Sequence, residues 1–210
     1  MKIGLTSRLD ITNDTKEIRS SVDVNWISFI RPIAETIDIF QTYDAHSILD
    51  VSDFDLVIFT GGNDLSTQTD NFLSKMRDDC EIKLLADCLK HDVAVLGVCR
   101  GMQLIHHFFD GALNRVAGHV AVNHEIEPTT NWLRDINVVN SYHNWGIDEV
   151  SLSPDFEVSA RCKHDGSVEA IQHRYLRVRG IMWHPERWTE DLETLDIYRQ
   201  RHQNILGYVK

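Results

Sequence analysis

The chain has 210 residues, of which 42% are hydrophobic, and a formal net charge of −11 at pH 7. This length can bury one good core, so we expect one domain over residues 1–210. The acidic balance argues against a nucleic-acid-binding protein, which would normally show a basic face. Because no apolar stretch approaches the roughly twenty residues needed to span a bilayer, and strand-like residues stand where a signal peptide would begin, we expect a cytoplasmic protein without a membrane partner.

Strand-like and helix-like segments alternate along the first hundred residues. Residues 2–6 are predicted to begin the sheet, and apolar residues between 26 and 34 recur at helical spacing. A longer amphipathic helix is predicted over residues 71–91, and it leads into the apolar run 93–96. This order favours a parallel sheet, in which functional residues lie at the carboxyl ends of the strands.

Residues 9–20 are predicted to form a long, polar and charged loop of the kind that often covers a substrate. Arg8 and Arg19 could bind an anionic leaving group such as a phosphate, because guanidinium groups suit phosphoryl oxygens. Solvated surface arginines are at least as common. The role of both residues therefore stays open.

A glycine pair follows the short apolar strand predicted over residues 56–60. Gly61 and Gly62 leave backbone N–H groups free to point outward, and such donors stabilise the oxyanion of a tetrahedral intermediate. Most such glycine pairs are ordinary turns, so this signal is weak by itself.

Cys99 is the strongest candidate nucleophile. It lies between Gly97 and Gly101, where the apolar run 93–96 gives way to a helical segment. A tight turn, an exposed strand end and a helix N-terminus together favour a reactive thiolate. The backbone N–H of Arg100, the next residue, is a second candidate oxyanion donor.

His184 and Glu186 supply the partners that a nucleophile needs. They stand two positions apart at the end of another apolar run, and in an extended segment such residues face the same side. His184 can then take the thiol proton while Glu186 orients its ring. A strand end carrying a satisfied histidine is the structural alternative.

The remaining cysteines and histidines predict no metal site. Cys80, Cys88 and Cys162 lack metal-type spacing, and reduced thiols are expected. His119 and His124 come with no evident third ligand. We therefore expect neither a metal nor a cofactor.

The second half of the chain changes character. Short alternating runs between residues 113 and about 179, such as 137–140 and 167–171, predict an antiparallel extension that flanks the site. Residues 192–208 are predicted to form a terminal helix that packs on the core.

Three ordered motifs resemble a known superfamily. FTGGNDLS, GVCRGMQ and MWHPE, in that order and at those intervals, are similar to the class I glutamine amidotransferases. Two further segments, 77–81 and 140–144, resemble the γ-glutamyl hydrolases classed as C26 peptidases. The resemblance covers most of the chain.

This resemblance implies a flavodoxin-like three-layer fold with a mostly parallel central sheet and a small antiparallel extension. It also implies that Cys99 attacks a γ-glutamyl carbonyl and forms a thioester that water releases, with Gly62 and Arg100 at the oxyanion positions. The residues expected to bind the substrate are Gly61, Asn63, Gln103, Ser141, Tyr142 and His143. Where related polyamine-pathway enzymes carry a second histidine and a glutamine, this chain has Asn144 and Trp145, so the leaving-group side of the pocket is expected to differ.

Three functions follow from these observations. The favoured one is a γ-glutamyl hydrolase that acts on a small conjugate, either of an amine or of a nucleotide-linked amidate. The alternative is a glutaminase subunit that passes ammonia to a partner synthase. The third is a non-enzymatic module, which would not need His184 and Glu186 together. The first requires only its small-molecule substrate, although a homo-oligomer is compatible with it.

Overall fold

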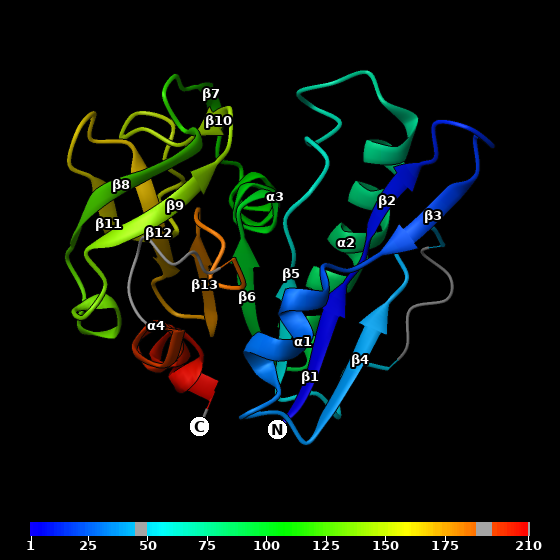
Figure 1. Cartoon of the computed structure of the whole chain (residues 1–210), viewed down its shortest axis with the longest axis horizontal. Helices are drawn as coiled ribbons and strands as arrows, with labels where there is room; N and C mark the ends of the chain where they lie inside the picture. Colours follow the sequence, from blue (N-terminus) through cyan, green and yellow to red (C-terminus); the bar gives the residue numbers. More distant parts are fainter. Residues whose placement is uncertain (45–49, 188–194, 210) are drawn as a thin grey trace.

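A nine-stranded sheet forms the centre of the molecule (Figure 1). The computed structural model describes residues 1–44, 50–187 and 195–209. One half of the sheet consists of β1 (Lys2–Thr6), β4 (Thr36–Phe40), β5 (Leu56–Phe59), β6 (Ala94–Val98) and β13 (Val178–Ile181). Neighbours in the order β4-β1-β5-β6-β13 are all parallel.

The other half of the sheet is antiparallel. It continues from β13 through β12 (Val168–His173), β11 (Phe156–Cys162), β8 (Val120–Pro128) and β9 (Val138–Tyr142). Two short strands, β7 (Asn114–Arg115) and β10 (Trp145–Gly146), pair beside it. The mostly parallel sheet with an antiparallel extension is therefore confirmed.

Helices cover both faces of the parallel half because its buried strands alternate their side chains between two cores. One core joins the sheet to α1 (Val24–Ile30), the 3₁₀ turn η1 (Asn131–Leu133) and η2 (Asn204–Val209). The other joins it to α2 (Phe72–Lys90) and α3 (Arg100–Phe108). These three layers match the flavodoxin-like arrangement that the sequence motifs imply.

Two local predictions need correction. Residues 9–20 form most of a hairpin of β2 (Arg8–Ile11) and β3 (Ile18–Ser21), in which Leu9 is buried, instead of an irregular loop. The first helix ends at Ile30, short of residue 34, because Pro32 has no backbone N–H with which to continue the helical hydrogen bonds. By contrast, α2 fills its predicted range, and the side chain of Asn71 caps its first turn.

The terminal helix is present in the described part of the chain. α4 (Leu195–Gln203) runs into η2, and Tyr198, Ile205 and Leu206 are buried. Residues 192–194 of the predicted helix lie outside the described residues. Among the described helices, none is long and apolar enough to cross a membrane.

Candidate active site

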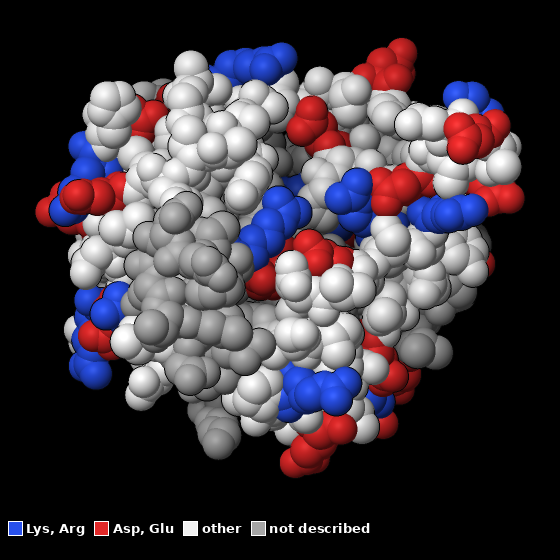
Figure 2. All heavy atoms as spheres, in the orientation of Figure 1, with Lys and Arg blue, Asp and Glu red and all other residues white. Residues whose placement is uncertain are grey.

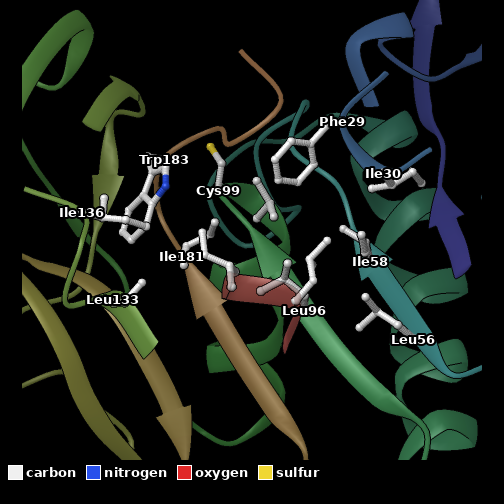
Figure 3. Packing of buried hydrophobic residues seen from close by; sticks show 14 of the residues in the cluster. Phe29, Ile30, Leu56, Ile58, Leu96, Cys99, Leu133, Ile136, Ile181 and Trp183 are labelled. Carbon is white, nitrogen blue, oxygen red and sulfur yellow. The ribbon is translucent and has the colours of Figure 1, made fainter. Parts of the chain in front are cut away.

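Cys99 lies on a sharp turn between β6 and α3. Its backbone has φ 52° and ψ −108°, in the positive-φ region that a residue other than glycine rarely adopts. The turn is tight: a Cβ at Gly97 would stand 2.6 Å from the backbone of Gly101. Figure 3 shows the Cys99 sulfur at the carboxyl end of β6, above the buried core. This is the elbow expected of a nucleophile.

His184 connects Cys99 to Glu186. The ring Nδ1 lies 2.7 Å from a Glu186 carboxylate oxygen, and the ring and Cys99 line the same cleft. The three predicted residues therefore come together, in an arrangement that would suit a nucleophile, a base and an orienting acid. The ring packs closely against Gly61, where an added Cβ would stand 2.5 Å from its Cε1 atom.

The environment of His184 favours its protonated form. Burial lowers the pKa of the imidazole, but the negative charges of Cys99 and Glu186 outweigh it and raise the pKa from 6.5 to about 9. In its protonated form His184 can serve as a proton donor.

Asn140, which sequence reasoning did not assign to the site, holds the His184 segment in place. Its side-chain amide donates to the carbonyl oxygens of His184 and Arg187, and its side-chain oxygen accepts from the N–H of His184. Asn140 lies on β9, next to Tyr142, whose ring meets the His184 ring edge-on. The sequence signal for Asn140 was its position in the segment 140–144, which resembles the C26 peptidases.

Four buried charged residues support the nucleophile side of the site. This arginine–carboxylate cluster consists of Arg77, Asp78, Glu81 and Arg100. Glu81 forms an ion pair with each of the two arginines, and Arg100 also forms an ion pair with Asp78. Opposite charges in equal number, each hydrogen-bonded, make this burial tolerable.

The arginine–carboxylate cluster also fixes the glycine loop. Arg77 donates to the carbonyl oxygens of Thr60 at 2.8 Å and Gly61 at 3.0 Å. Gly62 has φ 125°, a backbone conformation that favours glycine. A Cβ added at Gly62 would also lie only 2.8 Å from the Arg77 guanidinium. The arginine–carboxylate cluster therefore contacts both the loop of Gly61 and Gly62 and Arg100, the residue after Cys99.

An open cleft of about 740 Å³ lies over the nucleophile. Figure 2 shows basic and acidic side chains next to one another in the middle of this face. The residues that line the cleft are Arg8, Gly62, Asn63, Asp64, Cys99, Tyr142, His184 and Arg187. Arg187, absent from the sequence-based candidates, is thus placed beside the nucleophile.

The predicted substrate residues divide into two groups. Asn63 and Tyr142 line the cleft, while Gly61 lies against the His184 ring and does not line it. Gln103 is buried and donates to the carbonyl of Trp145. Ser141 and His143 are also buried, and their side chains lie near His119 and Glu169, away from the residues that line the cleft.

Two comparisons of the sequence point to one family. The model of the peptidase C26 family matches residues 37–186. The γ-glutamyl-CDP-amidate hydrolase of Campylobacter jejuni is 32% identical over 195 residues, which cover 89% of this chain and 90% of that protein. Protein NtpR of Enterococcus hirae is 30% identical and covers 65% of this chain and 68% of its own length.

Solved structures agree on the fold. PurLQS from Thermotoga maritima superposes with a TM-score of 0.69 at 17% identity, covering 100% of this chain and 99% of that one. A glutamine amidotransferase from the same organism gives a TM-score of 0.67 at 15% identity, covering 98% and 84%. The chain belongs to the peptidase C26 family, has the fold of the class I glutamine amidotransferases, and is a hydrolase of carbon–nitrogen bonds.

Proposed function

We propose that the protein hydrolyses the γ-glutamyl amide bond of a small conjugate through a γ-glutamyl thioester on Cys99. One observation carries the proposal. Cys99, His184 and Glu186 form a connected set under an open cleft, and the loop of Gly61 and Gly62 lies against the histidine. That set contains the nucleophile, the proton carrier and the orienting acid that acyl transfer needs.

The reaction proceeds in two halves. The Cys99 thiolate attacks the γ-carbonyl carbon, and the backbone N–H groups of Gly62 and Arg100 stabilise the oxyanion. The C–N bond then breaks as His184 gives its proton to the leaving nitrogen, which leaves a thioester. In the second half His184 takes a proton from water, the hydroxide attacks the thioester, and glutamate departs as the sulfur becomes a thiolate again.

The cleft favours an anionic leaving group. Arg8 and Arg187 both line it, and both remain partly exposed. Arg8 pairs with Asp10, whereas Arg187 lies 5.0 Å from the centre of the Tyr142 ring and 3.8 Å from a carboxylate oxygen of Asp23. Guanidinium groups of this kind bind phosphoryl oxygens. Together with the similarity to a hydrolase of a γ-glutamyl-CDP-amidate, they support a nucleotide-linked amidate as substrate.

A substrate panel tests the proposal. The purified protein is assayed alone for glutamate release from γ-glutamyl cytidine diphosphate amidate, γ-glutamyl amines and free glutamine. We expect the nucleotide conjugate to give the highest kcat/KM and glutamine the lowest. Turnover of glutamine that appears only with added cell extract would contradict a stand-alone hydrolase and favour the glutaminase subunit of a synthase.

A further inference from the structure

Three histidines and a glutamate meet inside the antiparallel half of the molecule. His119 precedes β8, His124 lies on β8, His143 follows β9, and Glu169 lies on β12. We refer to these four residues as the histidine cluster. The strands that carry it occupy the left side of Figure 1, and none of its members lines the cleft over Cys99. The expectation that His119 and His124 lack a third ligand is therefore wrong.

Glu169 is the unusual member. Its side chain is 0% exposed, and neither carboxylate oxygen makes a hydrogen bond of acceptable geometry to any described residue. A buried carboxylate in this state is costly unless a cation compensates it. No arginine or lysine of the described residues forms an ion pair with it; its ion-pair contacts there are histidine nitrogens.

The spacing of these atoms fits the ligands of one ion. Glu169 Oε1 lies 3.5 Å from His119 Nδ1 and 3.6 Å from His143 Nε2. All three atoms lie within 4.8 Å of one another. Ligands at about 2.0–2.1 Å from a tetrahedral Zn²⁺ are separated by about 3.3 Å. The separations are long for hydrogen bonds and close to those of a metal's ligands.

The far nitrogen of each of two rings already has an acceptor. Nε2 of His119 lies 2.9 Å from a carboxylate oxygen of Asp165, and Nδ1 of His143 lies 3.1 Å from the carbonyl oxygen of Trp145. A proton on each far nitrogen leaves a lone pair on the near nitrogen, which in His119 also lies 3.4 Å from the hydroxyl oxygen of Ser141. Such outer hydrogen bonds accompany metal-binding histidines in general, because they fix the tautomer and the orientation of the ring.

We propose that the histidine cluster binds a Zn²⁺ ion through His119 Nδ1, His143 Nε2 and Glu169 Oε1. His124 is the candidate for a fourth ligand, since its Nε2 lies 3.4 Å from the second Glu169 oxygen and makes no hydrogen bond to a described residue. Zn²⁺ accepts histidine nitrogen and carboxylate oxygen ligands and prefers four of them in a tetrahedral arrangement. Cys162 stays outside this set and faces Nδ1 of His124 at 3.7 Å.

The ion would stabilise the segments of the active site that carry Tyr142 and His184. His143 directly follows Tyr142, which lines the cleft, and the backbone carbonyl of Glu169 accepts from the N–H of Met182, two residues before His184. A metal at this point would tie the ends of β8 and β9 to β12. Its binding energy would therefore add to the stability of the segments that carry Tyr142 and His184.

Metal content of the purified protein tests the site. After dialysis against a chelator, the protein is loaded with Zn²⁺, freed of excess ion and analysed by elemental mass spectrometry. We expect about one zinc per chain in the native protein and less than a tenth of that in Glu169→Gln, which keeps the side-chain volume. The matched control is His164→Gln, because His164 is exposed in the neighbouring turn and should leave the zinc content unchanged.

Cobalt gives a readout that does not depend on a variant's folding. Co²⁺ added to the native protein should give the visible bands of tetrahedral nitrogen and oxygen coordination, without an intense near-ultraviolet band from a thiolate ligand. A thiolate band that disappears in Cys162→Ser would overturn the Glu169-centred set. Native protein that retains no zinc, or Glu169→Gln that retains as much as the native chain, would overturn the site altogether.

Discussion

Two buried polar clusters support the proposed active site, and their charges are compensated in different ways. The arginine–carboxylate cluster contains two cations and two anions that pair with one another. In the histidine cluster a single carboxylate faces three histidines at distances too long for good hydrogen bonds. The first is complete from protein groups alone, whereas the second has the composition and spacing of a metal site.

The two clusters support different halves of the active site. Arg77 holds the glycine loop, and Arg100 directly follows the nucleophile. The histidine cluster instead adjoins Tyr142 and the strand that carries Asn140, which holds His184. Buried charge on either side therefore acts as a scaffold for Cys99 and for His184 respectively.

Removal of the Cys99 sulfur should have the largest effect. Cys99→Ala deletes the nucleophile without contacting either cluster's charges, so we expect kcat/KM to fall by about 10⁴-fold or more with little change in melting temperature. Glutamate release and thermal denaturation measure the two quantities. A variant that keeps a tenth of native turnover would show that another group attacks the substrate.

Glu186→Gln tests the part of the site that carries His184. The substitution removes one of the two negative charges, those of Cys99 and Glu186, that raise the pKa of His184. We therefore expect kcat to fall by roughly 10²–10⁴-fold. The alkaline limb of the pH–kcat profile, expected near pH 9 in the native protein, should move to lower pH. An unchanged limb would mean that Glu186 does not set the protonation of His184.

The same pKa has a consequence for stability. Because the folded pKa of about 9 lies above the ordinary value of 6.5, protonated His184 stabilises the folded chain fully below pH 6.5. This contribution is lost as the pH rises through about 9. Denaturant titrations at pH 6, 8 and 10 should therefore show a decline that is smaller in Glu186→Gln than in the native protein.

Glu81→Gln breaks the arginine–carboxylate cluster. It leaves Arg77 and Arg100 buried with one compensating carboxylate between them, so we expect the free energy of unfolding to fall by about 3–5 kcal/mol. Urea denaturation measures the loss. Glu157→Gln is the control, because its ion pair with Arg174 is exposed and should contribute little. Equal losses in the two variants would refute the proposed role of burial.

Arg187→Met should have the smallest effect, although Arg187 Nε also lies 3.7 Å from a carboxylate oxygen of Glu186. We expect KM for a phosphate-bearing conjugate to rise roughly tenfold, while KM for a neutral γ-glutamyl amine stays the same. Arg19→Met is the matched control, because Arg19 is exposed, pairs with Glu17 and does not line the cleft. Equal changes for both substrates would argue against a contact with the leaving group.

The sequence predicted the turn at Cys99 and the helix of residues 72–90 well because their signals are local. Cys99 lies between two glycines at a strand end, and Arg77 and Glu81 stand four residues apart on a helix. The histidine cluster escaped prediction because Glu169 and His119 are fifty positions apart and meet only through strand pairing. The hairpin over residues 8–21 escaped for a related reason, since its polar composition concealed the buried Leu9.

The most direct test of the proposed function is to trap the covalent intermediate. The protein is mixed with γ-glutamyl cytidine diphosphate amidate, quenched in acid within the first turnover, and analysed by peptide mass spectrometry. The proposed mechanism predicts a glutamyl adduct on the peptide that contains Cys99, formed in the native protein and absent from Cys99→Ala. Glutamate release that proceeds in Cys99→Ala at the native rate, with no adduct in either protein, would contradict it.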